Sequence, residues 1–448
     1  MENVNTTYEK TFSPAQRYFN YFFKSQSAGG VVLLVCTLIA LVFANVPALS
    51  GVCSLWNTEC GLHIGGFSID MSLLEWVNEG LMAVFFFSVG LEIKREMTIG
   101  QLSSMKKASL PVFAALGGMI FPALIYLVFN AGNPLSSRGW GVPMATDIAF
   151  AIGIISLLGK RVPIGVKVLL TALAIADDLG SIIVLAIFYP THALNFAALG
   201  IALGVFAVLI VFNRLNVFRG WIYILGGIVL WYFVLESGIH STIAGVLLAI
   251  TIPMKSDSTQ ARVLGRITHH LNRFREVSNK EMDNMPNSGQ LHIIHAMSEE
   301  LDQMEPLLHK FETKLSNVVN FAIMPIFALA NASVVIDLGA FSQGLPPVVP
   351  GVFFGLLCGK PLGIFLFSLL AVKMKIAQLP ENTGWKHIFA MGILGGIGFT
   401  MSIFIDNLAF SDPLVADVGK VAILLTSFTA AVAGLLVMKS VTKENNKE

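Results

Sequence analysis

Leu170–Ala186 reads LTALAIADDLGSIIVLA, an apolar run interrupted by two adjacent carboxylates, Asp177 and Asp178, with Thr171 and Ser181 as its other polar residues. Apolar sequence continues for more than a helical turn on both sides, as in a membrane-spanning helix. One charge at mid-membrane depth costs about 2.5–3.5 kcal/mol on insertion scales, and neighbouring carboxylates also repel each other. The pair therefore indicates a compensating cation, proton or buried base, rather than two aspartates at a loop end.

The composition of the whole chain supports a membrane protein. Its 448 residues are 55% hydrophobic and only 13% charged, whereas soluble domains carry about 25% charged residues. Glycine is abundant, which suits close packing of membrane helices. No basic patch with interleaved aromatic residues is present, so nucleic acid is not an expected partner. We expect no cleavable signal peptide, because the first long apolar run begins at Ala28.

Hydropathy and length predict an all-α polytopic fold with about twelve transmembrane helices. Their approximate limits are 28–46, 73–93, 109–130, 142–158, 164–189, 195–212, 219–236, 240–253, 316–337, 350–372, 386–410 and 416–438. An amphipathic helix at the membrane interface is expected over Tyr18–Lys24. The predicted domains are an N-terminal segment (1–27), helices one to eight (28–253), a charged cytoplasmic insert (254–315), helices nine to twelve (316–438) and a tail (439–448).

The distribution of lysine and arginine predicts the orientation, because these residues concentrate in cytoplasmic loops. One set of connections is basic, and the alternate set holds only Arg138, with Lys420 just inside the last helix. The basic set, besides the insert, contains Lys94, Arg95, Lys106, Lys107, Lys160, Arg161, Arg214, Arg219, Lys373, Lys375, Lys386, Lys439, Lys443 and Lys447. We therefore expect a multi-pass protein of the plasma membrane, the inner membrane of a bacterium, with both termini in the cytoplasm.

Two of the predicted helices are interrupted. GVPMATDIAFAIGII (141–155) contains Pro143 and a polar Thr146-Asp147 pair, and IFAMGILGGIGFTMSIFI (388–405) contains four clustered glycines. Unwound backbone at membrane depth is tolerated only where it is buried in protein or lines a cavity. Each break falls in the second helix of a three-helix set. This pattern predicts inverted repeats with two discontinuous helices that cross at mid-membrane, as in secondary transporters.

A buried lysine completes the candidate ion site. Lys360 lies midway along the predicted helix 350–372, where pairing with a carboxylate is favoured over snorkelling to the interface. Broken helices present partial positive charge at N-termini and partial negative charge at C-termini. Asp147 offsets the former and Lys360 the latter, which leaves a cavity suited to a small cation.

Two smaller features lie outside the predicted helices. The glycine-rich stretch 46–72 has alternating residues that predict a β-hairpin, and it contains Cys53 and Cys60. We predict that these two cysteines are bridged in an oxidising compartment, with two free thiols as the alternative. In the charged insert, His292 and His295 are spaced to share a helix face. Ordinary surface histidines are favoured there over metal ligands.

Between about Ser27 and Met438, apart from much of 256–304, the chain resembles the NhaA-type sodium/proton antiporters, a family that is itself an example of the inverted-repeat architecture. The motifs that carry the resemblance are NEGLMAVFFFSVGLEIKRE (78–96), ATDIAFAIGI (145–154), ALAIADDLGSI (172–182), GIHSTIAGV (238–246), MPIFALANA (324–332), GKPLGI (359–364) and GGIGFTMSIFI (395–405). The resemblance implies an electrogenic secondary antiporter, not an enzyme and without a cofactor. It would extrude cytoplasmic Na⁺ or Li⁺ in exchange for protons and regulate internal pH and sodium.

The resemblance also implies roles for individual residues. Asp178 would be the principal Na⁺ carboxylate, while Asp177 would pair with Lys360 in the proton-loaded state and exchange that partner for the cation. Thr146 and Asp147 would line the crossing of the broken helices. The implied pH-sensing residues are Glu92, Arg95, Glu96, Glu305, His309 and His240, the last of which also fits a plain polar residue at a helix start.

The family resemblance extends to assembly, with two departures in sequence. It implies a homodimer formed through 46–72 and embedded in membrane lipid. Glu79 stands where the family usually has aspartate, and Pro306 stands where it usually has histidine.

Three alternative functions remain open at this point. The nearest is a sodium-coupled symporter of similar fold. An intramembrane aspartyl protease would need two aspartates on facing helices, such as Asp147 and Asp178, but the ammonium of Lys360 would keep an acid–base carboxylate ionised. A cation channel is disfavoured because no repeated pore loop or ring of charges is present. No phosphate-binding GxxxxGK[ST] motif occurs, so ATP is not an expected energy source.

Overall fold

The fold is described by a computed structural model over residues 28–64, 67–190, 193–256, 260–277, 287–335 and 344–444. The expected interfacial helix Tyr18–Lys24 lies outside these residues. Within them, nine helical segments are long and apolar enough to cross a membrane. They are α3 (Ala28–Asn45), α4–η3–α5 (Leu73–Thr98), α6 (Met105–Asn130), η4 and α7 (Ser137–Ser156), α8 (Ile164–Phe188), α9 (Phe196–Arg214), α14–η6–α15 (Leu307–Asn331), α16–η8–α17 (Val348–Lys373) and α20 (Pro413–Glu444).

Three further predicted spans take other forms. The helices α18 (Trp385–Gly395) and α19 (Phe399–Ala409) form one apolar pair bent by 49° at the break between them. The helices α10 (Gly220–Glu236) and α11 (Thr242–Thr251) are apolar but shorter. Each predicted span therefore coincides with a described helix or helix pair, while the number that actually cross the bilayer stays a prediction.

The ninth predicted span differs from expectation at its start. The helix begins at Leu307, well ahead of 316, with Pro306 as the residue before its first turn. Proline lacks an N–H donor and cannot continue a helix that precedes it, but it fits the start of a new one. The polar residues of α14 (Leu307–Val318) hid this start from a hydropathy reading, because the first turns of the helix are charged.

Three of the long segments contain a π-helical turn, namely η3 (Trp76–Leu81), η6 (Val319–Ile323) and η8 (Gly355–Gly359). Such turns are rare in proteins as a whole, and many of those that occur lie at functional sites. The turn η8 ends immediately before Lys360, the first residue of α17 (Lys360–Lys373). The π-helical turn therefore directly precedes this buried lysine.

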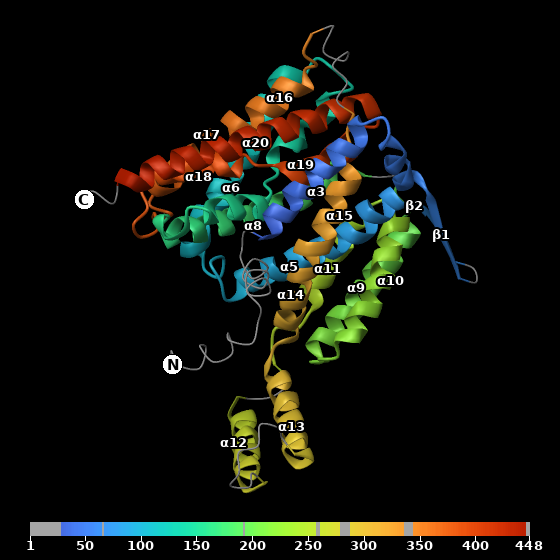
Figure 1. Ribbon diagram of the computed structural model, residues 1–448, viewed down its shortest axis with the longest axis vertical. Helices are drawn as coiled ribbons and strands as arrows, with labels where there is room; N and C mark the ends of the chain where they lie inside the picture. The colour runs from blue at the N-terminus through green and yellow to red at the C-terminus, as the bar shows by residue number, and fades with distance from the viewer. Residues whose placement is uncertain are drawn as a thin grey trace.

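The helices pack into two groups (Figure 1). A large apolar core joins α6, α8 and α15–α20, and a smaller one joins α9, α10, α11 and α14, with α5 (Met82–Thr98) contributing to both. Glycines allow the closest approaches, because a Cβ on Gly117 of α6 would meet the carbonyl of Gly363 on α17. Likewise, a Cβ on Gly245 of α11 would meet the carbonyl of Ala83 on α5. This is the small-residue packing that membrane helices use.

The predicted β-hairpin is confirmed. Strands β1 (Glu59–Ile64) and β2 (Phe67–Ser72) pair antiparallel, with Leu62 opposite Ile69, and project from the helical body (Figure 1). The prediction of a Cys53–Cys60 bridge is wrong for this structure, because both thiols are free. Cys53 belongs to the short helix η2 (Ser50–Asn57), whereas Cys60 is held in the ladder of β1 opposite Met71.

The charged insert contains two helices, α12 (Gln260–Val277) and α13 (Ser288–Met304), which lie beyond the end of α14 (Figure 1). A 2.9 Å ion pair between Arg266 and Glu300 joins them. His292 and His295 both lie on α13, as their spacing predicted. A short helix, η5 (Gly159–Arg161), connects α7 to α8.

Candidate functional site

Two interruptions of helical structure meet at the centre of the larger helix group. In the first, three non-helical residues, 145–147, separate η4 (Ser137–Met144) from α7 (Ile148–Ser156). In the second, Gly396–Gly398 separates α18 from α19. The backbone N–H of Asp147 donates to the carbonyl of Ile397 over 2.7 Å, so the two breaks are in direct contact. This junction brings two helix N-termini and two helix C-termini together.

The carboxylate of Asp147 stabilises the partial positive charge of the two helix N-termini at this junction. One carboxylate oxygen accepts from the backbone N–H of Phe150 at 3.0 Å, at the start of α7. The other accepts from the backbone N–H of Thr400 at 3.3 Å and from its hydroxyl, at the start of α19. One buried carboxylate therefore caps both N-termini, which is where a negative charge is most stabilising.

The ammonium of Lys360 stabilises the C-terminal end of η4 at this junction and also binds a carboxylate. Its ammonium lies 2.7 Å from Oδ2 of Asp177 and donates to the carbonyl of Met144, the last residue of η4. The side chains of Lys360 and Asp177 are each 1% exposed. The hydroxyl of Thr146 lies 2.6 Å from the same Asp177 oxygen and 3.0 Å from the carbonyl of Gly395. A buried ion pair with these added hydrogen bonds satisfies the condition under which such pairs are tolerated.

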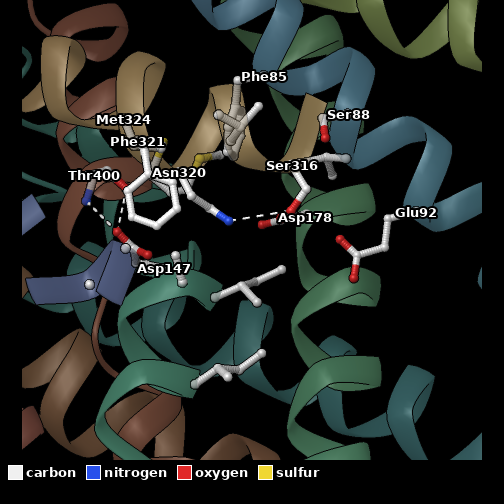
Figure 2. Close-up of a pocket in the computed structure, with 18 of the residues that line it drawn as sticks. Phe85, Ser88, Glu92, Asp147, Asp178, Ser316, Asn320, Phe321, Met324 and Thr400 are labelled. Atoms are coloured by element: carbon white, nitrogen blue, oxygen red, sulfur yellow. Dashed lines mark hydrogen bonds between the residues drawn. The ribbon is translucent and has the colours of Figure 1, made fainter. Parts of the chain in front are cut away.

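Asp178 is the carboxylate that this network leaves uncompensated. It is 1% exposed, and its Oδ1 has no hydrogen-bond partner among the described residues. It lines a cavity of about 420 Å³ together with Glu92, Asp147 and Thr400. Figure 2 shows Asp147 and Thr400 on one side of this cavity and Asp178 and Glu92 on the other. An orphaned buried carboxylate facing a polar cavity calls for a positive ligand.

The residues assigned to pH sensing fall into two separate groups. The first lies near the end of α5, where Arg95 pairs with Glu96 at 3.0 Å and with Glu312 of α14 at 2.8 Å. His309 lies 3.7 Å from Glu305 and 3.9 Å from Glu312. Glu312 therefore contacts both Arg95 of α5 and His309 of its own helix, α14.

The second group is formed by His240 at the start of α11. Its Nδ1 lies 3.5 Å from Glu79, whose carboxylate also accepts from the hydroxyl of Ser241 at 2.6 Å. His240 is 1% exposed. No contact among the described residues links this group to Arg95 or His309, so the six residues do not form one cluster.

Two residues of interest escaped the sequence reasoning. Glu312 had no distinguishing signal, because it lies in a stretch that is charged throughout. Asp406 did have one, since it interrupts the apolar run IFIDNLAF (403–410). It is 0% exposed and stands one residue after the motif GGIGFTMSIFI.

The chain is similar in sequence to sodium/proton antiporters. A solved structure of the sodium proton antiporter MjNhaP1 from Methanocaldococcus jannaschii aligns over 96% of this chain and 99% of that one, with 10% identity and a TM-score of 0.46, too distant to support an argument. "Na(+)/H(+) antiporter NhaA 2" of Flavobacterium johnsoniae is 44% identical over 433 residues, which cover 96% of this chain and 95% of that protein. "Na(+)/H(+) antiporter NhaA" of Helicobacter pylori is 45% identical over 441 residues, covering 97% and 98%. Residues 20–438 match the sequence profile described as Na+/H+ antiporter 1, and the chain therefore belongs to that family.

Proposed function

We propose that this protein is a secondary antiporter that extrudes cytoplasmic Na⁺ or Li⁺ in exchange for external protons. The names of its relatives support sodium and protons as the exchanged ions. The observation that carries the proposal for the site is the ion pair between Lys360 and Asp177, next to Asp178, whose Oδ1 has no hydrogen-bond partner among the described residues. The basic connections support an orientation with both termini in the cytoplasm of a bacterial inner membrane.

The charges of the site explain why it would select a cation. With Asp177, Asp178 and Lys360 all ionised, the three side chains carry one net negative charge. Asp147 adds another, but its oxygens are engaged by the N-termini of α7 and α19. The group therefore attracts a single Na⁺ to the side of Asp178. Carboxylate and hydroxyl oxygens, including that of Thr146, are suitable ligands for such a hard cation.

Proton coupling follows from competition for the same carboxylates. A protonated carboxyl is a poorer ligand for a hard cation, so Na⁺ binding favours the fully ionised pair. Return without Na⁺ favours a neutral site, with one proton on Asp178 and another shared by Asp177 and Lys360. Na⁺ binding at Asp177 would displace Lys360 as its partner and leave that lysine neutral, so both protons are released. Each cycle would then move two protons for one sodium ion, which makes the exchange electrogenic.

The same geometry argues against a proteolytic role. An aspartyl protease needs two carboxyl groups whose oxygens are free to share a proton and activate water. Both oxygens of Asp147 accept hydrogen bonds from helix N-termini instead, and Lys360 neutralises Asp177. The arrangement is better suited to holding an ion than to acid–base catalysis.

Regulation and assembly are further parts of the proposal. Arg95, His309 and Glu312 lie where α5 meets α14, close to Glu92 on the cavity wall, and we propose that this charged group controls entry of the cation. The hairpin of β1 and β2 projects from the helical body, which suits pairing with a second copy within the lipid bilayer.

The test of the proposed function is exchange in reconstituted vesicles. Purified protein in proteoliposomes that contain a pH-sensitive dye should move protons when Na⁺ or Li⁺ is added, and not when choline is added. A protonophore should collapse the signal. Sodium uptake without any proton movement would favour a channel instead. Proton movement in the same direction as sodium would favour a symporter.

A further inference from the structure

Besides Asp147, Asp177 and Asp178, the described residues contain a fourth buried aspartate, Asp406, far along α19 from the ion junction. It is 0% exposed, and neither of its oxygens has a hydrogen-bond partner among the described residues. An ionised carboxylate in that condition costs several kcal/mol unless a charge or a proton compensates it. The exchange site described above does not use this residue, so its presence needs a separate explanation.

The carboxylate of Asp406 is directed at the start of α20. A Cβ on Gly419 would collide with it, so the absence of a side chain at Gly419 makes room for the acid. The neighbouring residue Lys420 attracts Asp406 electrostatically, and Asp417 repels it. Lys420 also lies 3.7 Å from Asp417, whose side chain is 42% exposed. The ammonium of Lys420 is therefore paired with the accessible carboxylate, while its neighbour Gly419 is the residue of α20 that approaches the buried one.

The other helices around Asp406 add little charge. From α6, the phenol of Tyr126 interacts with Asp406 electrostatically but donates its proton to the carbonyl of Ser136 at 2.7 Å. The segment η4 carries a single charged residue, Arg138, which is exposed. Asp406, Asp417 and Lys420 together hold one net negative charge when all are ionised. One proton would neutralise this group, and the buried Asp406 gains most from taking it.

Residues next to Asp406 on α19 make hydrogen bonds in two directions, towards the hairpin and towards the ion junction. Next to it, Asn407 donates to Asn331 at 2.6 Å, and Asn331 donates to Asn78 at 2.9 Å, shortly after the hairpin. One helical turn towards the break, on the same face of α19, Ser402 donates to the carbonyl of Val142 at 2.8 Å. Asp406 therefore lies between the outer end of the bundle and the ion junction, beside η4.

We propose that Asp406 is a proton-exchanging residue of the antiport reaction, which accepts protons from the outer solution while Lys420 compensates its ionised form. A hydronium ion loses a proton and an O–H bond forms on the Asp406 carboxylate. The final acceptors in this proposal are the carboxylates of the ion junction, Asp178 and Asp177, and the O–H bond of Asp406 breaks when the proton leaves towards them. Lys420 keeps its own protons throughout. The inference rests on the proposed sodium/proton exchange and adds an entry residue to it.

The test is the dependence of exchange on outer pH in oriented proteoliposomes. Asp406→Asn should need a higher outer proton concentration, which moves the midpoint to lower outer pH by about one unit, because proton capture loses its acceptor. Lys420→Met should move the midpoint the opposite way, because loss of the ammonium favours the protonated acid. Asp406→Glu should restore the original midpoint.

The matched control is Asp412→Asn, which removes a carboxylate at the start of α20, the helix that contains Lys420. Asp412 caps α20 through the backbone N–H of Leu414 at 3.0 Å, and asparagine preserves that cap. Its midpoint should not move. Equal midpoints in Asp406→Asn and the original protein, or a loss of rate at every outer pH in both test variants, would overturn the inference. Absence of exchange in the original protein would instead reject the proposed function.

Discussion

Two lysine–aspartate pairs in the same bundle differ sharply in their surroundings. Lys360 and Asp177 are both 1% exposed and lie 2.7 Å apart, with further hydrogen bonds to Met144 and Thr146. Lys420 and Asp417 lie 3.7 Å apart and are 15% and 42% exposed. The first pair is shielded from solvent, whereas the second is partly exposed to it.

Because of this difference in burial, we expect the Lys360–Asp177 pair to contribute much more to the free energy of unfolding than the Lys420–Asp417 pair. Removing one partner of a buried pair costs about 3–5 kcal/mol, because an uncompensated charge remains. An exposed pair contributes about 0–1 kcal/mol, since water and salt screen it. The short buried pair is thus tied to folding and to ion exchange together. The looser pair leaves Lys420 available to a second carboxylate, Asp406.

The largest expected effect is that of Lys360→Met. The substitution keeps the length of the side chain but leaves Asp177 buried without a cation, so we expect a loss of about 3–5 kcal/mol in stability and no exchange. Thermal unfolding in detergent measures the first effect and proteoliposome assays the second. Adding Asp177→Asn should restore much of the stability but none of the exchange. An unchanged unfolding midpoint in the single variant would contradict the comparison.

Asp178→Asn should abolish exchange while the protein remains inserted and folded. One buried charge fewer is easier to place in a membrane, so stability should be retained or increased. Na⁺-driven dye signals and the unfolding midpoint, measured on the same preparation, separate the two effects. Normal Na⁺-driven proton movement in this variant would remove Asp178 from the site.

Thr146→Val should have an intermediate effect. It preserves the shape of the side chain but removes the hydroxyl that serves Asp177 and the carbonyl of Gly395. Loss of hydrogen bonding to buried groups costs about 1–3 kcal/mol. Thr146→Ser, which keeps the hydroxyl, is the control and should stay close to the original protein. If valine and serine behave alike, the hydroxyl has no part in the network.

The smallest expected effect is that of Asp417→Asn on stability. Because Asp417 is 42% exposed and its contact with Lys420 is long, we expect a change of about 1 kcal/mol or less. Thermal unfolding at low and high salt is the measurement. A loss as large as that of Lys360→Met would show that exposure does not separate the two pairs.

Much of the fold followed from hydropathy and charge. Long apolar runs predicted the helices, and Pro143 with the glycines of 392–398 predicted the two breaks. Lys360 was predicted to need a carboxylate because a buried ion cannot remain alone. These features are local and carry a large energetic signal, so the chain shows them without tertiary information.

The remaining features depend on contacts between distant segments. The early start of α14 was missed because its first turns are charged, and Glu312 was missed for the same reason. The free thiols of Cys53 and Cys60 depend on how η2 and β1 are placed relative to each other, which their spacing in the sequence does not determine. Asp406 was visible as a carboxylate in an apolar run, but Gly419, the residue that makes room for it, comes from the next helix.

The central claim is that the two carboxylates Asp177 and Asp178 exchange more protons than sodium ions. Their shared use also predicts that apparent Na⁺ affinity falls as pH falls, because protons and Na⁺ compete for the same oxygens. Unequal exchange moves net charge, which couples to the membrane potential at about 2.3 kcal/mol per charge per 100 mV.

The most direct measurement is Na⁺/H⁺ exchange in proteoliposomes under a potassium gradient, with and without valinomycin. A potential that is negative on the side receiving protons should accelerate exchange, and a potential of the opposite sign should slow it. Identical rates under both potentials would contradict the two-carboxylate account of coupling, even if the protein still exchanges sodium for protons.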